Sequence, residues 1–423
     1  MRHVLILFPD EWDLLAALHP RNAGRYRFSF AGFDLFRFPE NLRLFTFDAL
    51  RFIEDTVRRH RGRGVDAVVT SDEQFGPYLA APIAAVLGVP HADLDAVLTI
   101  QHKFYARRAI EGIAPEANAR FGLLRVDSPE PPLPYPFYVK PAKAAFSVLA
   151  RRIDSSADLD RHTRFGWLER VILRRLVQPF AQVMRAHSRL TQDPFSMVVE
   201  EILHGPQVTA NGFVRNGEVT MLGTVDSVMY PGTDQFQRFE YPSALPPEAL
   251  SRIDALARRV IEGLGLAHGM FNIEMRMDPA TGMPRVIEIN PRAAGQFYDL
   301  FERVDGYDVF EALLELHCGG EPVITRGAGR QRHAASFVWR DLAGVGLSRW
   351  PTRGEIGELA QRHAEGHLMV YPKRGADLAR EMKWLGTYRY AVFNTGGATR
   401  DEMLASFERV DRDIDFHPRT RPA

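Results

Sequence analysis

Cysteine is almost absent from this sequence. Cys318 is the only cysteine among 423 residues, so the chain can form neither an intrachain disulfide nor a thiolate metal cluster. This scarcity fits a reducing compartment. In its context, "ELHCGGEP", the thiol is expected to be a partly buried small hydrophobic group.

Net charge and long apolar runs are also missing. Lys plus Arg and Asp plus Glu both total 53, which predicts neither a nucleic acid nor a membrane surface as partner. No window approaches the roughly eighteen apolar residues of a membrane span, and "MRHVLILFPDEWDLL" turns acidic too early for a signal peptide. We therefore expect a cytoplasmic protein. The basic clusters at 58–63 and 107–110 are interpreted as arginines on solvated helix faces.

What the sequence does contain is typical of a soluble globular protein, with 45% apolar and 25% charged residues. Its length predicts two to four compact units. Short β-rich runs alternate with helical ones over 1–95, which predicts a Rossmann-like α/β domain on a parallel sheet, although no G-x-G-x-x-G turn follows its first strand. We place a central unit at 96–322 and a smaller α+β domain at 323–423.

Two predicted strands carry the polar pattern that matters most. They are "MFNIEMRM" (270–277) and "RVIEIN" (285–290), joined by a Pro- and Gly-containing turn that suits a hairpin. Because residues two apart share a face of a strand, Glu288 and Asn290 oppose the apolar Ile287 and Ile289. Pairing of the strands should bring Glu274 and Glu288 together, with Asn290 at one end.

Two carboxylates and an amide oxygen form a ligand set suited to Mg²⁺. Without a cation, the two carboxylates would repel each other, and the pKa of one would rise. The alternative interpretation of these residues is an ordinary hairpin with a solvated polar face.

"FNIEMRM" and "VIEINPR" together resemble the metal-binding hairpin of the ATP-grasp superfamily, of the carboxylate–amine ligase type that includes the L-amino acid ligases. Further similarities follow the family's order. Lys103 in "QHKFYARRAIEGI" resembles the first ATP-binding lysine, and Lys140 in "PFYVKPAKAAFSV" resembles the second. The resemblance spans roughly residues 95–320 and implies an ATP-grasp fold with ATP and one or two Mg²⁺ (or Mn²⁺) ions as cofactors.

The segment "VVEEILHGPQVTANGF" (198–213) resembles the family's adenine hinge. By that resemblance Glu200, with the backbone of Glu201 and Leu203, would frame adenine, and Gln207 would contact the ribose. Two features depart from the family pattern. The phosphate loop "AKAAFSVLA" (142–150) contains no glycine, although Ser147 and its alanines are small enough for a tight variant. Gln207 also stands where many relatives carry an acid.

The resemblance implies an ATP-dependent, ADP-forming ligase that activates a small carboxylate as an acyl phosphate and couples it to an amine, possibly an amino acid. Arg292 would be the catalytic residue, because a planar guanidinium can hold two oxygens of the reacting group. We expect substrate selectivity to come from a loop at 226–246, which could equally be a packed crossover. Small molecules are the expected partners, and a homodimer is possible.

Two other functions remain open. One is a carboxylating ligase resembling biotin carboxylase, whose C-terminal region resembles residues 385–410. The other is a catalytically silent nucleotide-binding module.

Overall fold

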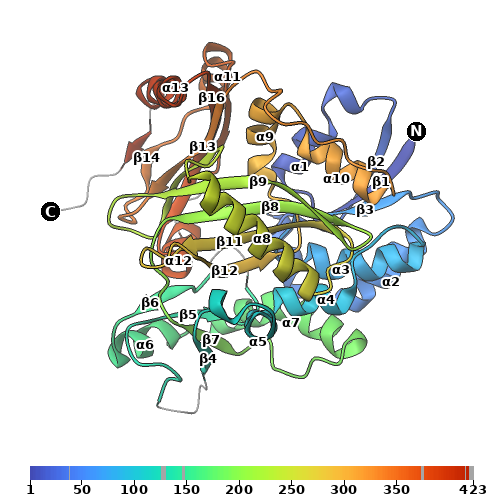
Figure 1. Ribbon diagram of the computed structural model, residues 1–423, viewed down its shortest axis with the longest axis vertical. Coiled ribbons are helices and arrows are strands. Elements are labelled where there is room, and N and C mark those ends of the chain that lie inside the picture. The colour runs from blue at the N-terminus through green and yellow to red at the C-terminus, as the bar shows by residue number, and fades with distance from the viewer. Residues whose placement is uncertain (38, 125–129, 145–147, 373–375, 415, 419–423) are drawn as a thin grey trace.

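The computed structural model describes residues 1–37, 39–124, 130–144, 148–372, 376–414 and 416–418 (Figure 1). Within these residues the strands form sheets of three, eight, two and four strands. In the part of the chain that is described, none of the helices combines the length and apolar character needed to span a bilayer.

The first sheet is parallel and has the order β2-β1-β3. Its strands are β1 (Arg2–Leu7), β2 (Tyr26–Ala31) and β3 (Ala67–Val69). The helices around it are α1 (Glu11–Ala17), α2 (Ala49–His60), α3 (Gly76–Leu87) and α4 (Leu94–Gln101), with 3-10 turns η1 (Pro20–Asn22) and η2 (Glu40–Thr46). This arrangement confirms the predicted N-terminal parallel sheet. Since parallel strands end at a common edge, the loops after β1 and β3 approach each other there.

A four-stranded antiparallel sheet, of order β4-β7-β5-β6, follows after helix α5 (Lys103–Ile113) and turn η3 (Pro115–Ala117). Its strands are β4 (Phe121–Leu124), β5 (Phe137–Pro141), β6 (Arg151–Ile153) and β7 (Met197–Glu200). Between β6 and β7 lie α6 (Ser156–Thr163) and α7 (Trp167–His187), in the stretch predicted as helical. This sheet lies below the large sheet in Figure 1.

The large sheet has the order β12-β11-β8-β9-β10-β13-β16-β15. Its members are β8 (Gln207–Arg215), β9 (Glu218–Met229), β10 (Phe236–Tyr241), β11 (Gly269–Met277), β12 (Pro284–Asn290), β13 (His333–Asp341), β15 (His367–Val370) and β16 (Tyr388–Gly397). The β8–β9 hairpin turns at Asn216 and Gly217, as predicted, and both have positive φ, 52° and 85°, the geometry that favours Asn-Gly in two-residue hairpins.

Helices and a small sheet complete the chain. They are α8 (Pro247–Gly263), η4 (Gly295–Phe297), α9 (Tyr298–Asp305), α10 (Val309–His317), α11 (Arg353–Arg362), α12 (Ala376–Leu385) and α13 (Arg400–Asp413), with β14 (Leu347–Arg349) paired to β17 (His417–Pro418). Helix α8 crosses one face of the large sheet (Figure 1). Its buried residues, among them Ile253 and Val260, belong to a core shared with β1, β8 and β11.

The structure bears on two expected segments, the loop at 226–246 and the domain boundary at residue 322. The segment 226–246, expected as a loop, instead contains the end of β9 and all of β10, because β10 pairs with β9 on one side and β13 on the other. The division at residue 322 stays a prediction. Of the strands that follow it, β13, β15 and β16 extend the large sheet, in which β13 pairs with β10 over four residue pairs beginning at Arg238 opposite Phe337. Strands β14 and β17 form the separate two-stranded sheet.

Candidate functional site

The β11–β12 hairpin brings its two glutamates together. Glu274 is directly opposite Glu288, and Asn272 is opposite Asn290, in an antiparallel pairing whose register shifts after Glu274. The Asn290 side-chain amide donates to Asn272 Oδ1 at 3.0 Å, which fixes the end of the pair. The predicted convergence of the two carboxylates is confirmed.

Glu274 lies among other acidic groups. Burial, followed by the charges of Glu288 and Glu73, raises the pKa of Glu274 to about 7. One donor partly offsets this: Gln207 Nε2 donates to Glu274 Oε2 at 3.0 Å. Gln207, predicted to contact a ribose, therefore lies in this structure beside the carboxylate pair, because β8 and β11 are neighbours that place Gln207 opposite Arg276.

Lys103 is the first residue of α5 and contacts the other glutamate. Its Nζ lies 2.7 Å from Glu288 Oε1 and donates to the carbonyl oxygen of Ala144 at 2.7 Å. The backbone N–H of Lys103 donates to Ala142 O at 2.8 Å, which ties the start of α5 to the end of the strand that carries Lys140. Lys103 thus links the carboxylate pair to the beginning of the predicted phosphate loop.

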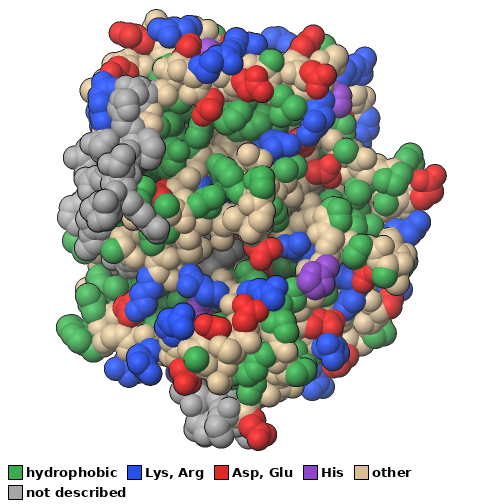
Figure 2. All heavy atoms as spheres, turned by 90° about the vertical axis from the view of Figure 1, so that its left-hand side faces the viewer, with side chains coloured by type: hydrophobic (Ala, Val, Ile, Leu, Met, Phe, Trp, Pro, Cys, Tyr) green, Lys and Arg blue, Asp and Glu red, His purple; other side chains and the backbone are tan. Residues whose placement is uncertain are grey.

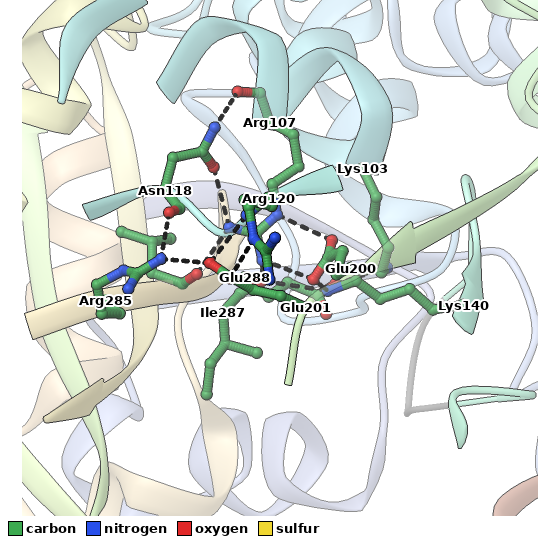
Figure 3. Close-up of polar contacts among 11 residues, drawn as sticks. Lys103, Arg107, Asn118, Arg120, Lys140, Glu200, Glu201, Arg285, Ile287 and Glu288 are labelled. Carbon is green, nitrogen blue, oxygen red and sulfur yellow. Dashed lines mark hydrogen bonds and ion pairs between the residues drawn. The ribbon is translucent and has the colours of Figure 1, made fainter. Parts of the chain in front are cut away.

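A second acidic group, Glu200 at the end of β7, is surrounded by cations (Figure 3). Arg107 donates from Nε and Nη2 to the two carboxylate oxygens at 2.8 and 2.7 Å, and Lys140 Nζ lies 2.9 Å from Oε2. Burial alone would raise the pKa of Glu200, but the charges of Arg107 and Lys140 outweigh it and hold the pKa at about 2. All three side chains are almost completely buried.

The same cations also bond to the edge strand of the large sheet. Arg107 donates to the carbonyl oxygens of Val286 and Ile287 at 2.7 and 2.9 Å, and Lys140 donates to Ile287 O at 3.2 Å. The Glu200 cluster (Arg107, Lys140 and Glu200) therefore joins β12 to the four-stranded sheet. The expectation that the arginines of 107–110 lie on a solvated helix face is wrong for Arg107, which is 2% exposed because it faces this acidic group.

The remaining predicted nucleotide contacts lie around the end of β7. Glu201 forms ion pairs with Arg120 and Arg285 at 2.8 and 2.6 Å, and its backbone N–H donates to Arg120 O at 2.9 Å. Leu203 is half-buried in the connection between β7 and β8. Ser147 lies outside the described residues.

Arg292, the predicted catalytic residue, pairs with Glu73. Glu73 comes from the loop after β3, so the N-terminal unit supplies a carboxylate to the site that the sequence analysis missed. Arg292 Nε is buried and has no hydrogen-bond partner among the described residues. The guanidinium therefore retains a donor for a further group.

Lys143 was also missed, although it follows Lys140 by three residues. Its Nζ lies 5.6 and 5.4 Å from the ring centroids of Tyr78 and Phe180, and the side chain is buried. Burial, together with the charge of Lys103, lowers the pKa of Lys143 to about 7. The spacing of two lysines in "VKPAK" was the signal that could have found it.

A half-buried arginine of the C-terminal strands faces acidic residues of the N-terminal unit. Arg389 on β16 lies over the ring of Tyr371 at 4.6 Å and approaches Gln296 Oε1 at 3.5 Å. Burial raises the pKa of Asp10, and the charge of Arg389 acts in the opposite direction. Among the described residues the two form no ion pair, although the charge of Arg389 acts on Asp10. No sequence pattern links residues so far apart in the chain.

The oxygen atoms that the hairpin offers as ligands suit a hard divalent cation. Carboxylate oxygens of Glu274 and Glu288 and the Asn290 amide are the ligand types that Mg²⁺ prefers, usually with water and phosphate oxygens completing the shell. Three or more His, Cys, Asp or Glu side chains do not converge as ligands anywhere in the described ranges, so such a cation would depend on those additional oxygens. Figure 2 shows a face of the molecule that is hollowed at mid-height, with acidic and basic side chains beside the hollow.

Comparisons with known proteins agree with this geometry. The sequence model described as "ATP-grasp domain" matches residues 133–299. Carnosine synthase 1 of Gallus gallus is 41% identical over 96 residues, which is 22% of this chain and 10% of that protein. The Mus musculus protein of the same name is 39% identical over 85 residues, 20% of this chain and 10% of the relative. The chain thus matches about a tenth of the length of these relatives.

Solved structures extend the likeness to nearly the whole chain. An L-amino acid ligase from Bacillus licheniformis superposes with a TM-score of 0.71 at 17% identity, covering 99% of each chain. A carboxyaminoimidazole ribonucleotide synthase from Aspergillus clavatus, in a crystal structure with ATP, gives 0.67 at 15% identity, covering 97% of this chain and 98% of that one. At such identities the likeness concerns the fold. Residues 133–299 therefore belong to the ATP-grasp domain family, and the chain as a whole has the ATP-grasp fold.

Proposed function

We propose that the chain is an ATP-dependent, ADP-forming ligase that activates a small carboxylate as an acyl phosphate and couples it to an amine. The observation that carries the proposal is the position of Glu274 opposite Glu288, with Lys103 in contact with Glu288. A half-buried acidic pair with a pKa near 7 on one member is costly to the fold unless a cation compensates it.

The roles of the basic residues follow from the charge of ATP. The nucleotide brings several negative charges, so a site that transfers its phosphoryl group requires cations placed in advance. Lys103 and Lys140 are the proposed phosphate-binding lysines, and Glu200 with its neighbours is the proposed base-binding edge. A Mg²⁺ ion held by Glu274, Glu288 and Asn290 would neutralise charge that develops between the phosphates.

Arg292 is proposed to hold the reacting carboxylate and its acyl phosphate. Its pairing with Glu73 fixes one side of the guanidinium, while the buried Nε has no partner among the described residues. A planar guanidinium can position two oxygens at once, which is the contribution that an acyl transfer to an amine requires.

An amino acid is the proposed amine or acid substrate. The named relatives, a carnosine synthase and an L-amino acid ligase, favour such compounds. The opposite charges of Asp10 and Arg389, which form no ion pair with each other among the described residues, would suit a molecule that carries both an ammonium and a carboxylate.

The test replaces Glu288 by Gln and measures phosphate release with pairs of carboxylates and amines. We expect release to fall by at least about 100-fold, because the cation loses a charged ligand. The matched control is Glu218→Gln, an exposed glutamate on β9 of the same sheet. Full activity in Glu288→Gln would contradict the metal assignment, and release that depends on bicarbonate in place of an amine would favour the carboxylating ligase.

A further inference from the structure

A group of basic side chains lies on the N-terminal unit, apart from the site described above. A cavity of about 300 Å³ opens there. The residues that line it, called the basic pocket below, are His3, Arg27, Ser29, His60 and Arg63. Two of them belong to the basic cluster at 58–63, which the sequence analysis assigned to a solvated helix face. That assignment is wrong for His60, which is 5% exposed.

The basic pocket lies at the opposite end of the parallel sheet from the nucleotide site. His3 is the second residue of β1, whereas the loops that carry Asp10 and Glu73 follow the carboxyl ends of β1 and β3. A strand of this length separates its two ends by roughly 15–20 Å at about 3.3 Å per residue. A ligand in the basic pocket would therefore not contact the reacting groups.

The hydrogen bonds within the pocket orient its donors. Arg27 Nη2 lies 2.9 Å from His3 Nδ1, and it also donates to the carbonyl oxygen of Arg63 at 3.2 Å. His3 Nδ1 also lies 3.3 Å from the carbonyl oxygen of Arg63, and His3 Nε2 lies 2.8 Å from Ser29 Oγ. His3 thus contacts Arg27, Ser29 and the backbone of Arg63 together, which holds these groups around the cavity.

Positive charge in the pocket is not compensated by a carboxylate in its lining. Asp66 accepts a hydrogen bond from the backbone of His3 at 2.7 Å but does not line the cavity. The Arg63 side chain has no ion-pair partner among the described residues, and the buried His60 Nδ1 has no hydrogen-bond partner there. Burial and the charges of His3, Arg59 and Arg63 lower the pKa of His60, as expected in a region of positive potential.

We propose that the basic pocket binds a phosphate group, either as the free ion or on a small molecule. Two guanidinium groups, a hydroxyl and an imidazole match the several oxygens and the double charge of phosphate better than those of a single carboxylate. A volume of about 300 Å³, against roughly 30 Å³ per water molecule in the liquid, has room for the phosphate and part of the group that carries it.

The test follows the His60 ring by NMR in protein labelled with ¹⁵N-histidine, with the resonance assigned from His60→Gln. A saturating, non-hydrolysable ATP analogue with Mg²⁺ occupies the phosphate positions of the nucleotide site. Inorganic phosphate and phenyl phosphate are then added at constant ionic strength, set with chloride. We expect either probe to raise the pKa of His60 by about half a unit or more, the size of a Coulomb effect at 4–5 Å in a watery site.

Two double variants make the test specific. Arg27→Gln with Arg63→Gln removes the charged donors, and this variant should lose the phosphate-induced shift. Arg51→Gln with Arg58→Gln removes the same charge from exposed positions of α2 outside the pocket, and it should keep the shift. An unchanged His60 pKa in tens of millimolar phosphate, an equal shift in both double variants, or the same shift with chloride alone would overturn the proposal. Tighter binding of phenyl phosphate would identify a phosphate ester as the ligand, and equal binding would identify the free ion.

Discussion

Glu200, which is buried, and Glu274, which is half-buried, are glutamates on strands that border the same site, yet their surroundings are opposite. Arg107 and Lys140 contact Glu200, so its carboxylate stays ionised with a pKa of about 2. Glu274 faces Glu288 and has Gln207 as its hydrogen-bond donor, and its pKa rises to about 7. One carboxylate is in direct contact with two cations, whereas the charges of Arg292 and Lys140 do not outweigh the burial and the neighbouring carboxylates at the other.

This difference separates a carboxylate that holds neighbouring elements together at the edge of the proposed site from one that is left to bind a cation. A buried carboxylate with two cationic partners fixes the elements that carry them, here α5, β5 and the edge of β12. A carboxylate left beside another carboxylate gains most from a cation that arrives from solution. The three predictions below test whether the two glutamates differ in this way.

The largest expected effect comes from breaking the cluster around Glu200. Replacing Arg107 by Leu leaves a buried carboxylate with a single cationic partner, which typically costs about 3–5 kcal/mol of stability. The thermal unfolding midpoint should therefore fall by several degrees. Arg108→Leu is the matched control, since its neighbouring side chain is exposed and forms only a surface pair with Glu111. Equal melting temperatures for the two variants would show that the Glu200 cluster does not hold the sheets together.

A smaller but more specific effect concerns pH. Because Glu274 must lose its proton to bind a cation, and its pKa without metal is about 7, Mn²⁺ affinity should rise up to tenfold per pH unit below 7 and level off above it. The measurement is a Mn²⁺ titration between pH 5.5 and 8.5. Glu274→Gln should bind weakly with no such step. An affinity that does not change across this range in the original protein would contradict the raised pKa.

The smallest effect distinguishes two roles for Gln207. Its donation to Glu274 favours the ionised carboxylate, so Gln207→Leu should move the pH midpoint of Mn²⁺ binding upward by a few tenths of a unit to one unit. If Gln207 instead contacts a ribose, as the sequence resemblance implies, the KM for ATP rises while the Mn²⁺ midpoint stays where it was. Measuring both quantities on the same variant decides between the roles.

Features that depend on neighbouring residues could be predicted well. The alternation in "RVIEIN" gave the faces of β12, and a short turn with Pro and Gly gave its pairing with β11. The Asn216–Gly217 turn was found in the same way. Both predictions use local geometry, in which spacing along the chain determines position in space.

Contacts between distant segments could not be predicted in this way. Arg107 was assigned to a solvated face because its neighbours are basic, and only the packing of α5 against β12 and β7 makes it a buried partner of Glu200. Glu73 and Arg389 reach the site from the first sheet and from β16, and no pattern in either segment marks them. Strand β10, within the aromatic segment 226–246, pairs on one side with the preceding β9 and on the other with β13, which lies about a hundred residues further along the chain.

The sequence by itself determined the β11–β12 hairpin, with Glu274 opposite Glu288, and the family resemblance, because each depends on residue types at short, fixed spacings. Tertiary structure alone decided which charges meet. It gave Glu200 two cations and Glu274 another carboxylate, and it collected His3, Arg27 and His60 from three elements around one cavity. Electrostatic energy depends on distance in space and on burial, and neither quantity is defined until the chain has folded.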